Sequence, residues 1–283
     1  MKRLLLAALV PALLVAQGPI LAQSKTKPAP KATSSVAVDS SLQGAVDAPT
    51  RDAKNRLRDS YRHPAQTLAF FGVKPTQTVV EITPGGGWYT EILAPYLKNG
   101  GQYVAAMYDP AIAGQPQYRY RQSEAMTKRL ADTAVYGNAK VQNFDPKAPN
   151  FGPAGSADVV LTFRNAHNWV DDGTADAYFK AFFDVLKPGG TLGVVDHRAK
   201  PGTDLEKMKT SGYLTEALVI ELAQKAGFKL QEKSEINANP KDTADHPNGV
   251  WTLPPTNQHD AKDDAKYKAI GESDRMTLRF VKP

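Results

Sequence analysis

The chain has 283 residues, 41% of them hydrophobic and 23% charged, an ordinary globular composition that excludes wholesale disorder and collagen-like repeats. It contains no cysteine, which excludes disulfides, thiol nucleophiles and Cys-ligated zinc or iron–sulfur sites. The formal net charge of +6 falls to +3 from residue 51 onward, because five of the 35 basic and two of the 29 acidic residues precede it, so nucleic-acid binding has no electrostatic support.

The first 22 residues have the pattern of a secretory signal peptide. Lys2 and Arg3 make a basic start, residues 4–15 form an apolar run, and Ala22 supplies a small residue at the cleavage position. The apolar run has twelve residues, whereas a membrane-spanning helix needs about 20. We therefore predict a signal peptide over residues 1–22, a periplasmic or secreted protein, and no stable membrane insertion after cleavage. An uncleaved anchor is the alternative.

The next segment, residues 23–50, is rich in Lys, Pro, Ala and Ser and has neither a helical nor a strand period. It cannot bury enough apolar surface to offset the entropy of ordering, which predicts a disordered linker. Residues 51–283 form the predicted domain. It opens with charges at helical spacing over 51–61, followed by a short helix that begins at Pro64, a residue tolerated at the first helical position.

From residue 78 onward, strand and helix patterns alternate. The predicted strands are 78–82, 102–108, 140–144, 158–163, 191–195, 228–236 and 276–281. This alternation predicts an α/β fold in which a mostly parallel, seven-stranded sheet carries helices on both faces. Residues 238–274 interrupt the alternation between the last two strands, and their polar, proline-containing sequence predicts a long surface insertion.

The turn after the first predicted strand carries the strongest functional signal. It reads Glu81-Ile82-Thr83-Pro84-Gly85-Gly86-Gly87. Open α/β sheets bind ligands at the carboxyl ends of their strands, and glycines there allow a tight turn and a close approach of the backbone to a ligand. The N-terminus of the following helix offers free N–H groups to a carboxylate or a phosphate. A plain tight turn without a ligand is the alternative.

Two further acids follow neighbouring strands. Asp109 ends the second predicted strand, where an acid can accept both hydroxyls of a ribose. Asp145 ends the third, where an adenine amino group can be met. Each acid alone is compatible with a solvated strand end, but three acids on successive strands together with the glycines favour a nucleoside site.

Two common nucleotide-binding patterns do not occur in the sequence. A dinucleotide fingerprint, G-x-G-x-x-G, counted from Gly85 or Gly86, needs its third glycine at Thr90 or Glu91. The P-loop pattern G-x-x-x-x-G-K-[ST] is also missing. The acid Glu81 faces a pyrophosphate unfavourably, but it suits the ammonium group of a cofactor that carries an amino acid.

The segment Val79–Gly87 resembles motif I of class I S-adenosylmethionine-dependent methyltransferases, (D/E)-x-G-x-G-x-G, with Thr83 in place of the first glycine. Asp109 resembles the ribose-binding acid of motif II, and Asp145 resembles the adenine-proximal acid of motif III. The run L-K-P-G-G-T-L at 186–192 is similar to the family's L-x-P-G-G-x-L.

This resemblance implies a Rossmann-like sheet whose last strand is antiparallel, and S-adenosyl-L-methionine as the cofactor. The implied cofactor-binding residues are Glu81, Thr83, Gly85, Gly86, Gly87, Asp109 and Asp145. More narrowly, the segments 70–75, 84–96 and 163–165 look like a group of exported, predicted methyltransferases of unassigned substrate.

The methyl acceptor is expected beyond the fourth predicted strand, which is followed by Arg164, Asn165 and His167. Arg164 suits a carboxylate or a phosphate, and Asn165 suits an amine or a hydroxyl. His167 suits the role of catalytic base, since imidazoles titrate near neutral pH, with a hydrogen-bonded structural histidine as the alternative. Trp169 is interpreted as a packing residue.

Two other polar pairs are weaker signals. Asp196-His197 ends the fifth predicted strand, but no G-x-S-x-G motif supplies a hydrolase nucleophile, and we predict a substrate-shaping role. Arg62-His63 is interpreted as a helix-start salt bridge, with a cap over the pocket as the alternative. Neither H-E-x-x-H nor a comparable ligand spacing occurs, so the sequence predicts no metal site.

The sequence leaves two functions open. One is an exported methyltransferase that acts on a small molecule or an envelope component. The other is a protein that keeps the fold and binds a nucleoside-like ligand without catalysis. A nucleic-acid methyltransferase is disfavoured by the predicted export, the near-neutral charge and the missing N/D-P-P-Y/F motif. The oligomeric state is not predicted.

Overall fold

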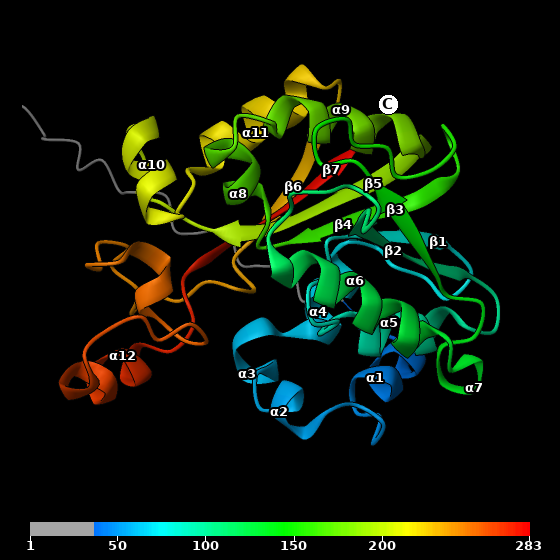
Figure 1. Ribbon diagram of the computed structural model, residues 1–283, viewed down its shortest axis with the longest axis horizontal. Coiled ribbons are helices and arrows are strands. Elements are labelled where there is room, and N and C mark those ends of the chain that lie inside the picture. Colours follow the sequence, from blue (N-terminus) through cyan, green and yellow to red (C-terminus); the bar gives the residue numbers. More distant parts are fainter. Residues whose placement is uncertain (1–36) are drawn as a thin grey trace, which may run out of the picture. The chain divides into compact units, whose positions relative to one another are not determined.

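A seven-stranded sheet organises residues 37–283, the part of the chain that the computed structural model describes (Figure 1). The strands are β1 (Thr78–Ile82), β2 (Gln102–Tyr108), β3 (Lys140–Phe144), β4 (Ala157–Phe163), β5 (Leu186–His197), β6 (Lys229–Ser234) and β7 (Arg275–Val281). Their order is β3-β2-β1-β4-β5-β7-β6. The first five strands pair in parallel, and β7 is antiparallel to both β5 and β6. The predicted fold class is confirmed.

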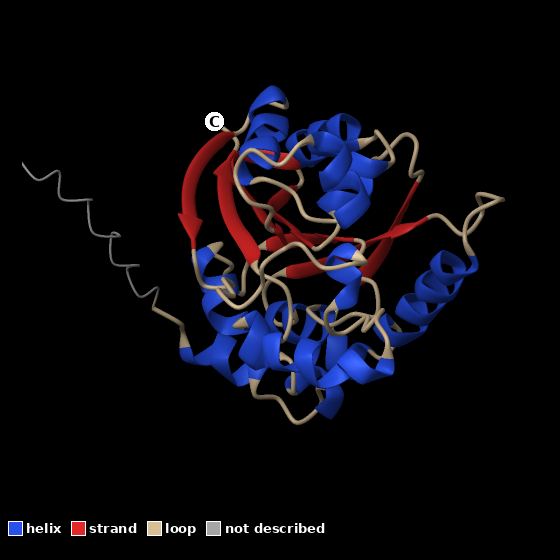
Figure 2. Ribbon diagram, turned by 90° about the vertical axis from the view of Figure 1, so that its left-hand side faces the viewer, coloured by secondary structure: helices blue, strands red, loops and turns tan. Residues whose placement is uncertain are grey.

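Helices cover both faces of this sheet (Figure 2). They are α1 (Ser40–Val46), α2 (Ala53–Arg56), α3 (Asp59–Arg62), α4 (Pro64–Phe70), α5 (Thr90–Leu97), α6 (Gln117–Leu130), α7 (Thr133–Tyr136), α8 (Ala166–Asp171), α9 (Ala175–Val185), α10 (Leu205–Ser211), α11 (Glu216–Lys225) and α12 (Asp264–Ile270), with 3-10 turns at Gly249–Thr252 and Ala261–Asp263. None of the helices in residues 37–283 is both long enough and apolar enough to cross a bilayer.

The alternation of side chains along β1 divides the interior into two cores. Val80 and Ile82 join one core with α8, α9 and α11. Val79 joins the other core with α1, α4, α5 and α6. Glu81 points to this second face, where a buried carboxylate stands among apolar neighbours.

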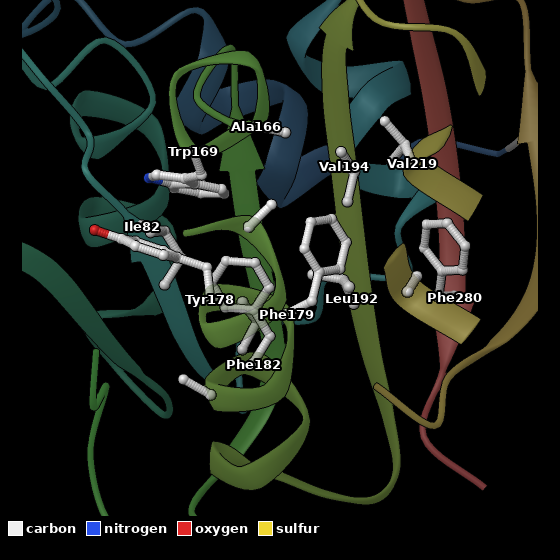
Figure 3. Close-up of a cluster of buried hydrophobic side chains, with 14 of the residues drawn as sticks. Ile82, Ala166, Trp169, Tyr178, Phe179, Phe182, Leu192, Val194, Val219 and Phe280 are labelled. Carbon is white, nitrogen blue, oxygen red and sulfur yellow. The ribbon is translucent and has the colours of Figure 1, made fainter. Parts of the chain in front are cut away.

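Aromatic side chains of α9 dominate the first core (Figure 3). Tyr178, Phe179 and Phe182 are almost fully buried, as their helical spacing predicts. Trp169 of α8 is 1% exposed and stacks on Tyr178, with ring centroids 4.3 Å apart and an interplanar angle of 18°. The interpretation of Trp169 as a packing residue is confirmed. Thr174 occupies the N-cap position of α9, but its side chain makes no capping hydrogen bond.

The described part of the chain includes a piece of the predicted linker. Residues 1–36, with the predicted signal peptide and most of the linker, lie outside the described residues. Within 37–50, however, Asp39 caps α1 by accepting from the Leu42 N–H at 2.8 Å, and it also accepts from the Tyr96 hydroxyl at 2.8 Å. Leu42 and Val46 are buried. Apolar residues four positions apart share one helix face, so even this short polar segment docks, and the folded region begins before residue 51.

Two other boundaries differ from the prediction. The charged segment 51–61 contains two one-turn helices, α2 and α3, instead of one continuous helix. Strand β5 starts at Leu186 instead of residue 191, because Leu186 pairs with Ala157 of β4 and the Gly189 N–H donates to Lys282 O at 2.8 Å.

Several hydrogen bonds to Asp242 fix the insertion at 238–274. Asp242 accepts from the Tyr213 hydroxyl at 2.9 Å, from His246 Nε2 at 2.8 Å and from the Asp274 N–H at 2.7 Å. The segment therefore contains a fixed substructure with two 3-10 turns and α12, although the polar sequence predicts only a surface insertion.

A matched pair of glycine substitutions tests how closely Gly193 of β5 packs against Phe71, the residue after α4, and against Leu161 of β4. A Cβ at Gly193 would lie 2.7 Å from both Leu161 Cδ2 and Phe71 Cγ, whereas a Cβ at Gly44 in α1 would meet nothing within 4 Å. We expect Gly193→Ala to lower the free energy of unfolding by about 1–3 kcal/mol. Gly44→Ala should leave it unchanged or raise it by up to about 1 kcal/mol. Urea unfolding measures both, and equal effects would contradict this packing.

Candidate functional site

The candidate site lies where β1 and β4 pair in the middle of the sheet. From β1 the chain proceeds outward to β2 and β3, and it then returns to β4 on the other side of β1. Such a reversal of strand order leaves a crevice at the carboxyl ends of the two central strands. The structure has two cavities at this point, and both include residues from the ends of β1 and β4.

The first, which we call the arginine cavity, has a volume of about 300 Å³ and is lined by residues of the segments 55–62, 81–89 and 163–165. The second, the Tyr108 cavity, has a volume of about 400 Å³ and is lined by residues of 83–85, 108–122 and 165–172. Both share Thr83, Gly85 and Asn165, so they adjoin at the strand ends.

Asn165 ties the two strand ends together. Its Nδ2 donates to the Ile82 carbonyl at 3.0 Å and to Thr162 Oγ1 at 3.3 Å. These bonds fix the β4 loop against the end of β1, and they place the amide at the boundary of the two cavities. Contact of Asn165 with an amine or a hydroxyl of the acceptor stays a prediction.

The glycine-rich turn adopts left-handed backbone at alternate positions. The φ angles are 43° at Thr83, 58° at Gly85 and 81° at Gly87. Glycine adopts such angles without strain, but a β-branched residue there is a genuine outlier. Arg164, at the end of β4, also has a positive φ of 64°. Strained residues of this kind cluster at ligand sites because the surrounding structure must hold them.

The side chain of Thr83 is also unusual, because its buried Oγ1 has no hydrogen-bond partner in residues 37–283. An unmade hydrogen bond of a buried polar group costs about 1–3 kcal/mol. Gly86 differs from its neighbours: it is exposed, has no left-handed φ, and a Cβ there would meet nothing within 4 Å. The turn thus presents a free hydroxyl and an open backbone surface to the cavities.

Glu81 is the buried acid of the arginine cavity. Its Oε2 accepts from the Tyr103 hydroxyl at 2.6 Å, and Thr90 Oγ1 lies 2.7 Å from the same hydroxyl. Burial raises the pKa of Glu81 to about 7, against the smaller opposing effects of Tyr103, Thr90 and Arg62. A cation in the cavity would favour the carboxylate, so Glu81 can bind a positive group and release a proton near neutral pH.

The side chain of Arg164 forms a hydrogen bond with His197. Its Nε donates to His197 Nε2 at 3.3 Å, and His197 Nδ1 lies 2.5 Å from Ser273 Oγ. Because Nε2 accepts a hydrogen bond, the ring hydrogen is assigned to Nδ1, which then donates to Ser273. Burial, and next the Arg164 guanidinium, hold the pKa of His197 well below its ordinary value, so the ring stays neutral and orients Arg164.

His167 lines neither of the two cavities. It is buried, and its ring Nδ1 lies 2.9 Å from Asp196 Oδ1. Its backbone N–H donates to Asp196 Oδ2 at 3.2 Å. Its ring centroid is 5.1 Å from that of His197, so it is linked to the arginine cavity through His197 and Arg164. The role of His167 as a base stays a prediction, whereas its hydrogen-bonded structural role is visible.

Asp196, His167 and His197 also bring three potential metal ligands together, with ligand atoms within 4.8 Å of one another. The spacing of these residues in the sequence gave no such signal. Asp196 Oδ1, however, already accepts from His167 and from the His197 N–H at 2.8 Å. The guanidinium of Arg164 contacts the remaining nitrogen of His197 and would repel a metal cation. This geometry favours a hydrogen-bonded network over a metal centre.

The two other predicted acids stand at the same edge of the sheet but line neither cavity. Asp109 Oδ1 accepts from the Ala111 N–H at 2.9 Å, and exposed Asp145 accepts from the Lys147 N–H at 2.8 Å. Both side chains therefore stabilise their own turns. Tyr108, just before Asp109, lines the second cavity instead. Cofactor contacts of Asp109 and Asp145 stay predictions.

A larger cavity, of about 830 Å³, lies beyond the end of β5 and contains no residue of the glycine-rich turn. Arg198, in its wall, donates five hydrogen bonds of 2.8–3.1 Å to Glu216, Glu235 and Asp274. Since Glu216, Glu235 and Asp274 are already bound by Arg198, we regard the switch-point cavities as the better candidate site.

Several residues of the arginine cavity are not singled out by sequence patterns. Tyr89 stacks on Phe163 with ring centroids 3.7 Å apart, and Trp88 packs edge-on against Tyr89. Arg58 and Arg62 bring positive charge from the segment before the sheet. Of these, only Arg62 was considered individually, through the Arg62-His63 pair. It forms a salt bridge, with Glu272, and it also lines the cavity.

Comparison with known proteins supports the fold. No protein-family model and no curated protein matches the sequence. Similar solved structures include a SAM-dependent methyltransferase from Aquifex aeolicus, with a TM-score of 0.52 and 15% identity over 80% of this chain and 93% of that one. A geranyl diphosphate methyltransferase in complex with SAM has a TM-score of 0.53 and 13% identity, over 87% of this chain and 96% of that one. The chain therefore has the Rossmann-like fold of class I SAM-dependent methyltransferases.

The same fold also occurs in a protein with another named activity. The [4+2]-cyclase SpnF has a TM-score of 0.55 and 15% identity, over 82% of each chain. Fold likeness at such identities does not determine the reaction, which must be argued from the site.

The ionisation of Glu81 predicts a pH-dependent stability. Its pKa in the folded protein is raised from 4.5 to about 7, so the folded state binds more protons than the unfolded state between these values. We expect the free energy of unfolding to fall by up to about 3 kcal/mol as the pH rises through this window. Glu81→Gln should remove this part of the pH dependence.

Chemical denaturation at pH 5, 6, 7 and 8 measures the effect. Glu124→Gln, at an exposed position on α6, is the matched control and should retain the wild-type profile. Identical pH profiles for Glu81→Gln and the wild type would show that Glu81 does not titrate in this range.

Proposed function

We propose that this protein is a S-adenosyl-L-methionine-dependent methyltransferase acting on a small molecule or an envelope component. The observation that carries the proposal is the pair of adjoining cavities at the β1–β4 switch point, which share Thr83, Gly85 and Asn165. A methyltransferase needs one place for a nucleoside donor and a neighbouring place for an acceptor, since transfer requires both in line.

The residues of the glycine-rich turn suit this cofactor. The buried acid Glu81 suits the ammonium group of the amino-acid part, and the unpartnered Thr83 hydroxyl offers a hydrogen bond. Gly85 and Gly86 leave the backbone open to a close approach. Asp109 and Asp145 remain the proposed ribose and adenine contacts. Gly87 differs from Gly86, because its left-handed φ of 81° would strain a side chain at this position and a Cβ there would also displace the end of the Arg129 side chain, 2.5 Å away.

When bound, the cofactor supplies a methyl group on a sulfonium, which an acceptor atom displaces in line. The chain's own residues would orient the acceptor. Arg164 and Asn165 line the arginine cavity and are the proposed acceptor contacts. For His167, the bond to Asp196 and the position behind His197 favour a positioning role for the network that holds Arg164.

Export to the periplasm, or secretion, is part of the proposal and rests on the leader sequence alone. Cleavage after Ala22 would leave Gln23 as the first residue. N-terminal sequencing of the protein from fractionated cells tests it: a mature chain beginning near Gln23 outside the cytoplasm is expected, and an intact leader in the cytoplasmic fraction would refute it.

The predicted export also favours a second candidate, a nucleoside-ligand-binding protein without catalysis. The methyl donor is made in the cytosol, and the described residues do not indicate how it would be supplied outside. The two candidates share the donor site and differ in whether an acceptor is methylated.

Calorimetric titration at pH 8 with S-adenosylmethionine, its demethylated product and NAD tests the donor site. We expect the first two to bind and NAD not to. Glu81→Gln should weaken S-adenosylmethionine binding at least tenfold, by loss of a charge-assisted bond worth about 1.5–3 kcal/mol. Gly86→Val should also weaken it, because its side chain would fill the open face of the turn without straining the backbone.

The control variant is again Glu124→Gln, which should bind like the wild type. Tight NAD binding, or unchanged affinity in both Glu81→Gln and Gly86→Val, would refute the site. Cofactor binding without turnover over a broad acceptor panel would favour the non-catalytic candidate.

A further inference from the structure

The arginine cavity concentrates positive charge in a small volume. Three guanidiniums line its approximately 300 Å³: Arg58 and Arg62 from the segment before the sheet, and Arg164 from the end of β4. Arg62 is only 7% exposed. Arg58 and Arg164 are half-buried. Arginine is seldom buried without partners, so a buried and two half-buried arginines in one cavity wall require a specific explanation.

Their hydrogen-bonding capacity is largely unused. Within residues 37–283, Arg62 bonds through Nε alone, to Glu272 Oε2 at 3.2 Å, and Arg164 through Nε alone, to His197. Arg58 Nε donates to Glu272 Oε1 at 2.6 Å, while its buried Nη2 has no partner among the described residues. The terminal Nη groups, which suit bidentate binding of an oxyanion, thus remain available.

Glu81 is the one carboxylate among the described residues that line this cavity, and together with Glu272 it does not balance the three arginines and Arg275, which shares Glu272. Glu272 is the one carboxylate in residues 37–283 that hydrogen-bonds to any of the three, and Arg275 Nη2 shares it at 3.0 Å. Arg275, Arg62 and Arg58 hold the pKa of Glu272 at about 2 despite its burial. Burial, with the neighbouring guanidiniums, lowers the pKa of Arg62 to about 9 and that of Arg164 to about 10. An added anion would relieve this repulsion.

Two of the three arginines, and the carboxylate that binds them, come from segments outside the seven-stranded sheet. Arg58 and Arg62 precede β1, and Glu272 belongs to the insertion between β6 and β7. Glu272 therefore joins two peripheral segments and orients two of the three arginines. Trp88, Tyr89 and Phe163 supply aromatic side chains to the same cavity, and the Arg62 guanidinium lies over the Trp88 ring, 4.7 Å from its centroid.

We propose that the arginine cavity binds an acceptor that carries a carboxylate or phosphate group on an apolar body, with Arg58, Arg62 and Arg164 holding the oxyanion. The assignment of this ligand as the acceptor rests on the proposed methyltransferase function. The oxyanion class itself follows from the three arginines and their free Nη groups. Glu272 is a positioning residue for Arg58 and Arg62.

Anion binding is tested on the full-length protein. Inorganic phosphate and malonate are the probes, and chloride keeps the ionic strength constant. Calorimetry should detect binding of at least one probe to the wild type. Arg58→Gln should weaken it at least tenfold, and Arg58→Lys, which keeps the charge, should weaken it less. Exposed Arg56, on the same segment, gives the control Arg56→Gln, which should bind like the wild type.

Two results would overturn the oxyanion site. One is the failure of both phosphate and malonate to bind above chloride. The other is equal anion affinity in the wild type and Arg58→Gln. If Arg58→Gln does not fold, as judged by its melting curve, the comparison of Arg58→Lys with Arg56→Gln carries the test, and equal affinities in these two would overturn the proposal.

A second arm separates the acceptor from the methyl donor, because S-adenosylmethionine also carries a carboxylate. Its affinity and that of its decarboxylated analogue are measured in the wild type and in Arg58→Gln. The proposal expects Arg58→Gln to change both affinities less than threefold. A tenfold loss confined to the carboxylate-bearing donor would assign the arginines to the donor and overturn the proposal.

The proposed function and the acceptor class can be refuted separately. If phosphate or malonate binds through Arg58 but S-adenosylmethionine does not bind at all, the methyltransferase function and the acceptor assignment both fall. If S-adenosylmethionine binds through Glu81 while the oxyanions do not bind, the proposed function stands and the acceptor class is refuted.

Discussion

The parallel pairing of β1 with β4 is the constraint on which the candidate site depends. The two strands run side by side in register from Val79↔Val159 to Ile82↔Thr162. After them the chain turns to opposite faces, into α5 in one core and α8 in the other. Since the two connecting loops diverge, a crevice remains between the strand ends. Left-handed backbone at Thr83 and Arg164 is tolerated there because both flanking strands are fixed by the sheet.

Around this crevice the protein buries charges that water would otherwise stabilise. Desolvation disfavours the ionised form of each group, which explains why Glu81 titrates near neutrality and why the pKa of Arg164 is lowered. Glu272 offsets part of this cost for Arg58 and Arg62. Breaking such a buried pair from one side leaves an uncompensated charge. The packing of the peripheral segments therefore also determines the electrostatics of the site.

Local patterns predicted most of the framework. Continuous apolar runs such as that of β4, and the 3.6-residue period of α9, specify burial directly, so these elements were confirmed. The linker prediction was wrong for α1, because two apolar residues in a polar segment carry little periodic signal until a partner such as α5 is present. The position of the glycine-rich turn between β1 and α5 was confirmed, since strand ends and glycines are both visible in a sequence. The turn lines the cavities, and its contact with a cofactor stays a prediction.

By itself, the sequence determined the alternation of strands and helices, the position of the turn after β1 and the residue types available at the strand ends. Only the tertiary structure decided which of those residues share a cavity. Arg58 and Glu272 are 214 positions apart and meet through packing alone. Likewise, His167 and Asp109 follow strands as predicted, but one is buried behind His197 and the other is engaged in its own turn. The physical reason is that periodicity encodes which face of an element is buried, whereas contacts between distant segments depend on how complete elements pack.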